Sequence, residues 1–263
     1  MLFLSPLITS YSLIIAALAG FCLGSFLNCY AVRLSSGESV FRGRSRCPYC
    51  RQELSARELV PVFSFIFLRG RCRRCGGRIS PRYIISELLL AAVFVCILLR
   101  YDISASFARV ALLCCILFTL SLIDLDSGLI PDRFILAGIA LFLLFIPFTP
   151  DKSDYLLGGI IGGFSVSLPL FLLVLLMDKL LKKETMGGGD IKLLFMIGLF
   201  FNWKLNLFHI ILSCFTGLIF ALATMRAKPD MPFPFGPAIC VSSFIVMLCG
   251  EPLVNWYLSL IGI

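Results

Sequence analysis

Charged residues and histidines are scarce in this chain of 263 residues, and their scarcity excludes several classes of protein. Only 14% of the residues are charged and 59% are hydrophobic, whereas soluble domains carry about 25% charged residues. The single histidine, His209, lies within an apolar segment, so a Ser-His-Asp triad near the acidic residues is excluded, as is an H-E-x-x-H zinc protease. No G-x-G-x-x-G follows a strand, so no nucleotide-binding loop of that type is predicted.

Basic residues are absent before Arg33, and a chain without a basic n-region is not expected to carry a cleavable signal peptide. Apolar runs near or somewhat below the ~20 residues that a membrane-spanning helix needs recur along the whole sequence. The sequence therefore predicts an all-α polytopic membrane protein with about eight transmembrane helices. The runs cover residues 8–30, 84–100, 105–124, 133–149, 155–178, 191–203, 205–226 and 236–262, of which 191–203 is the weakest and could instead re-enter the membrane.

The distribution of basic residues predicts the orientation. Twelve arginines lie between Arg33 and Arg82, and basic loops stay in the cytoplasm. With eight crossings and the N-terminus outside, nineteen of the 23 basic residues fall inside and four fall outside. The net charge of +8 is thus mostly a signal of topology. It also favours anionic lipids as partners and makes a nucleic-acid partner unexpected.

The cysteine pattern predicts a metal site in residues 34–83. Two C-x-x-C pairs are separated by twenty-one residues, and both thiolates of such a pair can reach one tetrahedral zinc ion. A cytoplasmic loop is kept reduced, which favours metal ligands over disulfides. We expect a structural zinc ion; the alternative is four buried or redox-active thiols. The ligands would be Cys47, Cys50, Cys72 and Cys75, and the remaining eight cysteines would act as small hydrophobic residues.

Acidic residues occur at two predicted helix ends on the cytoplasmic side. "SLIDLDSGLIPDRF" carries Asp124, Asp126 and Asp132, and "ETMGGGDIKLL" carries Asp190. Two carboxylates at one depth could form a general acid/base pair. Spacing alone leaves other roles open. Asp132, after Pro131 and before an apolar run, is predicted to be a helix N-cap, and Asp126 most resembles a solvated turn residue. Asp190 could also be an N-cap, and Asp124 a membrane-edge residue reaching water.

Two other functions compete with catalysis. In a cation-coupled helical transporter, Asp124 and Asp190 would bind cations at a broken helix, but such sites lie near the membrane midplane between inverted repeats. The sequence shows no matched repeat and places the carboxylates at one edge. In a non-catalytic membrane scaffold with a zinc ribbon, the carboxylates would have no essential role.

A series of motifs occurs in order over nearly the whole chain: "GSFLNCYAVRL", the two cysteine pairs, "LVPVFSFIFLRGRCRRC", "SPRYIISE", "DLDSGLIPD", "MGGGDIKLL" and "PFGPA". Together these motifs resemble those of the type IV prepilin peptidase family, whose members are intramembrane aspartyl proteases with a Gly-x-Gly-Asp signature.

The resemblance implies which residues act. It selects Asp124, seven residues before Pro131, and Asp190 of the glycine motif as the catalytic pair. It also implies that Gly187, Gly188 and Gly189 bind an extended substrate backbone, and we expect the chain there to be non-helical.

The resemblance further implies the reaction and its location. Such enzymes remove the basic leader of prepilins or pseudopilins of pilus and type II secretion systems, and typically methylate the new N-terminus with S-adenosylmethionine. This implies a multi-pass protein of the bacterial cytoplasmic (inner) membrane with its active site at the cytoplasmic face. The chain would consist of a first transmembrane helix (1–33), a cytoplasmic zinc-binding domain (34–83) and a transmembrane aspartyl peptidase core (84–263). No S-adenosylmethionine contact is identifiable. Acids that could read the leader at short range are Glu53, Glu58, Glu184 and Asp126.

Overall fold

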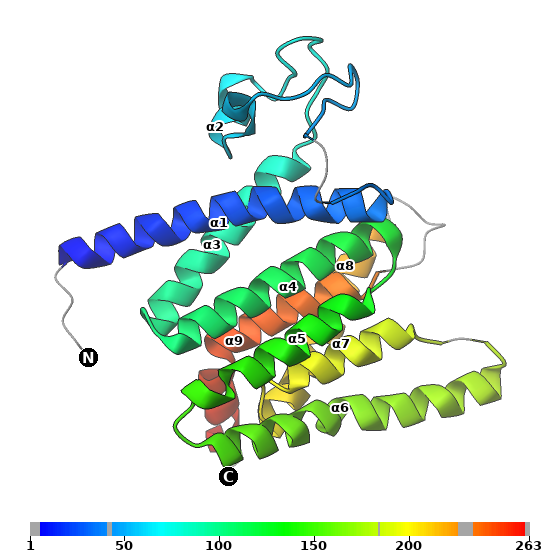
Figure 1. The fold of residues 1–263 in the computed structure, drawn as a ribbon. Helices are drawn as coiled ribbons and strands as arrows, with labels where there is room; N and C mark the ends of the chain where they lie inside the picture. Colours follow the sequence, from blue (N-terminus) through cyan, green and yellow to red (C-terminus); the bar gives the residue numbers. More distant parts are fainter. Residues whose placement is uncertain (1–5, 41–43, 184, 226–233, 261–263) are drawn as a thin grey trace. The chain divides into compact units, whose positions relative to one another are not determined.

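The computed structural model describes residues 6–40, 44–183, 185–225 and 234–260. These residues are predominantly helical, as Figure 1 shows. They include no β-strand, only the isolated bridges Arg46–Glu53 and Arg71–Arg78. The predicted all-α class is therefore confirmed. Glu184 and the predicted cytoplasmic loop 227–232 lie outside the described residues.

The chain forms two compact units, residues 1–107 and 108–263. The first unit holds two long helices, α1 (Pro6–Ser35) and α3 (Arg82–Tyr101). The loop between them carries the four paired cysteines and the short helices η1 (Ala56–Leu59) and α2 (Phe63–Phe67). The two units are defined by contacts within the structure. The predicted division at residues 33 and 83 is based on composition instead. That division stays a prediction.

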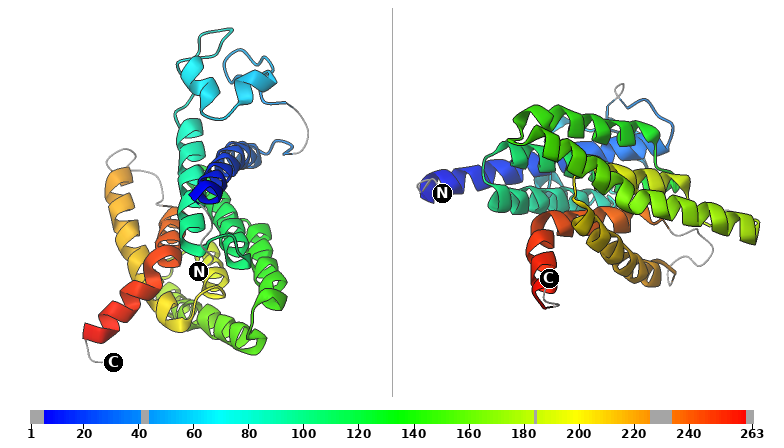
Figure 2. Two further views of the ribbon diagram at one scale, coloured as in Figure 1. Left: turned by 90° about the vertical axis from the view of Figure 1, so that its left-hand side faces the viewer. Right: turned by 90° about the horizontal axis from the view of Figure 1, so that it is seen from below.

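The second unit is a bundle of helices. Helix α4 (Ala105–Ser127) begins at the boundary between the units. It is followed by α5 (Asp132–Phe145), η2 (Ile146–Phe148), α6 (Lys152–Leu181), α7 (Gly188–Gly198), α8 (Trp203–Met225) and α9 (Gly236–Leu260). Helix α9 changes direction along its length (Figure 2) and contains Pro252, a residue that removes a helical hydrogen bond and bends a helix.

Each of the eight predicted apolar segments contains a helix among the described residues, but the helices differ in length. Six described helices are long and apolar enough to cross a membrane, namely α1, α3, α4, α6, α8 and α9. Helices α5 and α7 have only 14 and 11 residues. The protein is thus a multi-pass membrane protein, and the predicted count of eight crossings is not confirmed.

Helices α1 and α3 make close backbone contact at two glycines on one face of α1 (Figure 1). A Cβ atom added to Gly20 would lie 2.4 Å from the Cα atom of Ala91, and one added to Gly24 would lie 2.8 Å from the carbonyl oxygen of Ser86. Small residues four apart allow this approach, which is a common basis for helix association in membranes.

Glycines also bring α6 against α7, the helix that carries Asp190. A Cβ atom at Gly162 would lie 2.0 Å from the carbonyl oxygen of Phe201 and 2.4 Å from that of Gly198. The side chain of Asn206 donates to the Gly162 carbonyl at 2.6 Å. The position of α7 therefore depends on residue 162 being a glycine, which has no side chain.

We expect Gly162→Ala to destabilise the protein by about 1–3 kcal/mol, because backbone atoms must move to admit the methyl group. Gly158→Ala is the matched control on the same helix, since no atom lies within 4 Å of a Cβ added there. Thermal unfolding in one detergent should show a lower Tm for Gly162→Ala alone. Equal Tm values for the two variants would contradict this packing.

Candidate functional site

Asp124 lies in the last turn of α4 and is 5% exposed. At the end of this helix, the backbone N–H of Gly128 donates to the Asp124 carbonyl at 2.8 Å. Gly128 has a φ of 64°, the left-handed conformation that glycine favours at a helix C-terminus. The turn sequence after Asp124 thus ends the helix just beyond the carboxylate.

The Asp124 carboxylate is held by the start of α9. Its Oδ2 atom accepts a hydrogen bond of 2.9 Å from the backbone N–H of Gly236, the first residue of that helix. Helix N-termini bind anions through unpaired N–H groups and the helix dipole. A Cβ atom at Gly236 would lie 2.6 Å from Oδ2, so only glycine fits this contact. Gly236 had no role assigned from sequence, although it belongs to "PFGPA", one of the motifs that resemble those of the prepilin peptidase family.

Asp190 lies in the first turn of α7, behind the three glycines. Gly187 occupies the N-cap position with extended backbone, and the Asp190 N–H donates to its carbonyl at 3.1 Å. The expectation of a non-helical glycine segment is wrong from Gly188 onward, where the helix begins. The first N–H groups of a helix have no intrahelical acceptor. A helical turn at Gly188 can therefore still offer hydrogen-bond donors.

The two carboxylates belong to one site in the second unit. Asp190 is half-buried and lies within electrostatic range of Asp124. The thiol of Cys240 on α9 lies within electrostatic range of both. Gly189 approaches Ile130, with a contact of 3.1 Å for an added Cβ atom, whereas no atom of the described residues lies within 4 Å of a Cβ atom added to Gly188. As far as the described residues show, the glycine turn is therefore open at Gly188.

The other two acids of the region are exposed. Asp126 lies in the last turn of α4, so it is not the turn residue that we predicted, although it is exposed as expected. Asp132 is the first residue of α5 and makes no capping bond, because Pro131 takes the N-cap position. The prediction of an N-cap was wrong. Instead, Asp132 forms an exposed ion pair of 2.7 Å with Lys192 of α7.

His209 is fully buried between α8 and α9. Its Nε2 atom lies 2.9 Å from the hydroxyl of Ser243, 3.3 Å from that of Ser213 and 3.2 Å from the carbonyl oxygen of Ile239. These contacts make His209 a packed structural side chain.

The four paired cysteines gather in the first unit, with their sulfur atoms all within 4.8 Å of one another. The Sγ atoms of Cys47 and Cys75 are 3.8 Å apart, which matches the roughly 3.8 Å between sulfurs around tetrahedral zinc with Zn–S bonds of about 2.3 Å. Hydrogen bonds from the backbone N–H groups of Cys50 and Tyr49 lower the pKa of Cys47 to about 7. This favours the thiolate form that a metal needs.

Two turns of similar geometry present these thiols. In the first turn the N–H of Arg51 donates to the Cys47 carbonyl at 2.8 Å, and in the second the N–H of Gly76 donates to the Cys72 carbonyl at 3.0 Å. Arg51 and Gly76 both have positive φ, at 56° and 71°. Gly76 thus closes a tight turn after the second cysteine pair.

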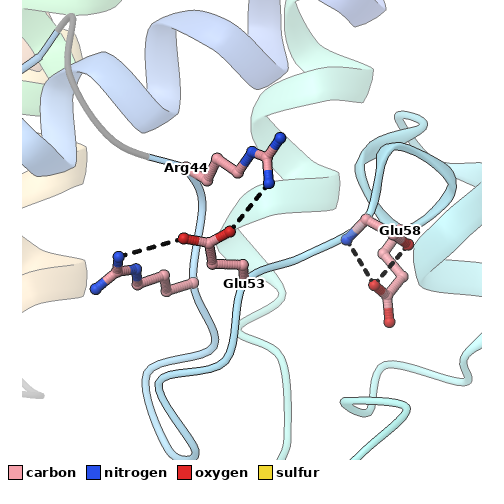
Figure 3. A network of polar contacts seen from close by, with 5 residues as sticks. Arg44, Glu53 and Glu58 are labelled. Atoms are coloured by element: carbon pink, nitrogen blue, oxygen red, sulfur yellow. Dashed lines mark hydrogen bonds and ion pairs between the residues drawn. The ribbon is translucent and has the colours of Figure 1, made fainter.

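The acids of the cysteine loop are already engaged by their own neighbours (Figure 3). Glu53 pairs with Arg44 at 3.2 Å and with Arg46 at 3.3 Å, and the hydrogen bond from Arg44 holds the pKa of Glu53 below its usual range. Glu58 accepts from the N–H and hydroxyl of Ser55 at 2.8 and 2.7 Å, and the backbone bond lowers its pKa. These contacts do not favour either glutamate as a reader of basic leaders.

Two buried polar residues of the first unit were not identified as important from sequence. Asn28 of α1 is fully buried and accepts from the Nε atom of Arg82 at 3.0 Å. Glu87 of α3 is 6% exposed and accepts from the N–H of Val62 at 2.6 Å. Val62 has a φ of 61°, which is strained for a β-branched residue. Their polarity within apolar runs is the signal that could have marked them.

Fold and site together define a multi-pass helical membrane protein that holds two acidic residues together at the ends of two helices and carries a four-cysteine cluster. Two protein-family models match this chain. The family model described as Bacterial Peptidase A24 N-terminal domain matches residues 18–101. The model described as Type IV leader peptidase family matches residues 111–222.

Curated relatives agree with these models. The prepilin leader peptidase/N-methyltransferase of Bacillus subtilis is 32% identical over 254 residues, which covers 92% of this chain and 96% of that protein. The proteins of the same name from Aeromonas salmonicida and Neisseria gonorrhoeae are 34% and 30% identical, covering 83% and 96% of this chain and 75% and 96% of their own lengths. No solved structure matches. The chain belongs to the type IV leader peptidase family.

We expect Glu87→Ala to loosen the loop around Val62. The substitution leaves the Val62 N–H without its acceptor, a loss of about 1–3 kcal/mol that corresponds to roughly 10- to 100-fold faster hydrogen exchange at this amide. Glu87→Gln keeps a side-chain oxygen acceptor and should stay close to wild type. Unchanged exchange at Val62 in Glu87→Ala would show that the carboxylate does not hold the loop.

Proposed function

We propose that this chain is an intramembrane aspartyl endopeptidase that removes the basic leader of type IV prepilins or pseudopilins. The observation that carries the proposal is the convergence of Asp124 and Asp190, from α4 and α7, beside an open glycine turn. Family membership supports the same activity, since the relatives bear the name prepilin leader peptidase/N-methyltransferase. It disfavours the transporter and scaffold alternatives.

In the proposed mechanism, the two carboxylates act as a general acid/base pair without a covalent intermediate. Two carboxyl groups at close range do not both ionise easily, so one is charged and the other is protonated. The charged member takes a proton from a water molecule as it attacks the scissile carbonyl carbon. The neutral member donates its proton to the carbonyl oxygen, and the roles reverse as the amine leaves. The titration belongs to the pair, not to either residue.

The residues around the acid pair fit the roles proposed for the two carboxylates. The Gly236 N–H donates to Oδ2 of Asp124 and fixes that carboxylate, which makes Gly236 a positioning residue. The first-turn N–H groups at Gly188 and Gly189 lie where an extended substrate backbone can accept hydrogen bonds. Because a Cβ atom at Gly188 would meet no atom of the described residues, we propose that a substrate chain has room there. Gly187, Gly188 and Gly189 are the proposed substrate-binding residues.

The active site is proposed to face the cytoplasm in the bacterial inner membrane, with the N-terminus outside. The support is the cluster of arginines between Arg33 and Arg82, since basic loops remain in the cytoplasm. The substrate leader is basic as well, so attraction to anionic lipids is proposed to gather enzyme and substrate at one surface.

Two cofactors are proposed. The thiols of Cys47, Cys50, Cys72 and Cys75 fit a structural zinc ion, because all four sulfurs converge with tetrahedral spacing. Methylation of the new N-terminus, which the relatives' name indicates for those proteins, requires S-adenosylmethionine as methyl donor. No contact among the described residues assigns its site, so no residue is proposed for it.

We expect Asp124→Asn and Asp190→Asn each to slow leader cleavage by roughly 10²–10⁴-fold, because each removes one half of the acid/base pair. The double variant should be no slower than either single variant, since residues that act as a unit show non-additive losses. Cleavage of a purified prepilin in matched detergent, with the products weighed by mass spectrometry, measures this.

Asp126→Asn is the matched control in the same helical turn, and it should keep most of the wild-type rate because its carboxylate is exposed. Asp132→Ala removes an exposed ion pair, worth about 0–1 kcal/mol, and should not abolish cleavage. An active Asp124→Asn beside an inactive Asp126→Asn would show that the first aspartate is misassigned. Full activity of Asp190→Asn would overturn the protease proposal.

Elemental analysis of protein purified without added metal should find one zinc ion per chain. Cys72→Ser and Cys75→Ser should release it and loosen residues 34–83, while the helices keep their own backbone hydrogen bonds. Cys249→Ser, an exposed cysteine outside the cluster, should retain the metal. Metal-free wild-type protein with a compact loop and paired disulfides would rule out the zinc site.

A further inference from the structure

The first turn of α9 contacts both α4 and α8. Its contact with α4 is the hydrogen bond of 2.9 Å from the Gly236 N–H to the Asp124 carboxylate. An N–H and an acceptor about 3.6 Å apart no longer form a hydrogen bond, so an outward shift of this turn by about 1 Å would break the contact. The position of the Asp124 carboxylate therefore depends on what holds the first turn of α9 in place.

Gly217 of α8 packs against residues on either side of Gly236. A Cβ atom added to Gly217 would lie 2.7 Å from Cε2 of the Phe235 ring and 3.7 Å from the Cβ atom of Ala238. The first of these distances is well below the roughly 3.5–4.0 Å of an ordinary contact between carbon atoms. The Phe235 carbonyl in turn accepts from the N–H groups of Ala238 and Ile239 at 3.1 and 3.2 Å. Phe235 is thus joined to the first turn of α9, and a side chain at residue 217 would press on that turn.

Polar contacts from α8 hold the same turn. The Thr216 hydroxyl lies 3.1 Å from the Ala238 carbonyl oxygen, and its single hydrogen is shared with two carbonyl oxygens of its own helix. Nε2 of the fully buried His209 lies 3.2 Å from the Ile239 carbonyl oxygen. Sliding α9 along α8 would separate these groups, and a polar group without a partner inside a membrane is costly. A larger side chain at residue 217 is therefore expected to displace the start of α9 sideways, where Gly236 lies.

We propose that Gly217 and Thr216 are positioning residues for the acid pair. They set the place of the first turn of α9, and with it the Gly236 N–H that holds the Asp124 carboxylate. Both residues act through α9 and not by contact with the substrate. The inference rests on the proposed function, in which Asp124 is one member of the catalytic pair.

The Gly236 amide can be observed by itself, because the dipeptide Phe-Gly occurs once in the sequence, at residues 235–236. In the full chain labelled with ¹³C-carbonyl phenylalanine and ¹⁵N-glycine, a carbonyl-edited NMR spectrum in detergent selects this amide alone. Amide protons in short hydrogen bonds to a carboxylate resonate downfield, and Asp124→Ala gives the signal position without the bond. We expect Gly217→Ala to move the signal toward that position. Thr216→Val should move it in the same direction by less, because the hydroxyl hydrogen is shared, and Thr216→Ser should restore it.

The same variants are assayed for leader cleavage. Gly217→Ala should lower kcat roughly 10- to 100-fold, the usual effect of losing a hydrogen bond to a charged group. KM should stay near wild type, because the proposed substrate-binding glycines belong to α7. A loss that came only from a loosened bundle would not separate kcat from KM in this way.

Two matched controls make the same chemical changes elsewhere in the second unit. Gly158→Ala adds a methyl group where no atom of the described residues lies within 4 Å. Thr119→Val removes a buried hydroxyl that donates within its own helix, to the Cys115 carbonyl of α4 at 2.8 Å. Both should leave the Gly236 signal and kcat near wild type.

A wild-type Gly236 signal in both Gly217→Ala and Thr216→Val would overturn the proposal. A displaced signal with wild-type kcat would also overturn it, because the contact would then not serve the reaction. Equal losses of kcat in the two controls would show a general sensitivity of the bundle and would count against it as well. The amide measurement needs no substrate, so it separates failure of this proposal from failure of the peptidase proposal.

Discussion

The cost of placing a carboxylate among apolar helices shapes the second unit. Asp124 is almost fully buried, and a buried charge needs donors at short range. The N-terminus of α9 supplies one through Gly236, at a contact so close that no larger residue fits. A helix from the end of the chain is thereby fixed to the end of α4. The acid pair, the glycine turn and the α9 N-terminus consequently form one arrangement.

Much of the fold and of the candidate sites could be predicted from sequence, because the sequence signals for them are local or compositional. Apolar runs gave the eight helical segments, and the C-x-x-C spacing gave a cluster in which four thiols do converge. The resemblance, not spacing, chose Asp124 over Asp126. In the structure, Asp124 is buried and lies within electrostatic range of Asp190, whereas Asp126 is exposed. Their catalytic roles stay a proposal until the variants are measured.

The features that sequence did not reveal depend on contacts between distant segments. Asp132 looked like an N-cap because an acid follows a proline before an apolar run, yet its partner is Lys192, sixty positions away. Glu87 and Asn28 lie in apolar runs, and only the folded unit shows that one holds the Val62 amide and the other the Arg82 guanidinium. Gly188 was expected to be non-helical because glycine favours irregular backbone, but the unpaired amides of a first helical turn offer donors within a helix.

The short length of α7 imposes a further constraint. Its 11 residues extend about 16 Å, roughly half of a bilayer core of about 30 Å. Its two ends therefore cannot lie at opposite membrane surfaces. The link from α7 to α8 is equipped to lie at depth: Leu199 and Phe201 are buried, their amides donate to carbonyls of the preceding turn, and the Asn202 side chain accepts from the Leu205 amide. Irregular backbone is tolerated within a membrane only when it is satisfied inside the protein in this way. The Asp190 end, where no atom of the described residues lies near a Cβ atom added to Gly188, is then the end that can reach water, as the proposed hydrolysis requires.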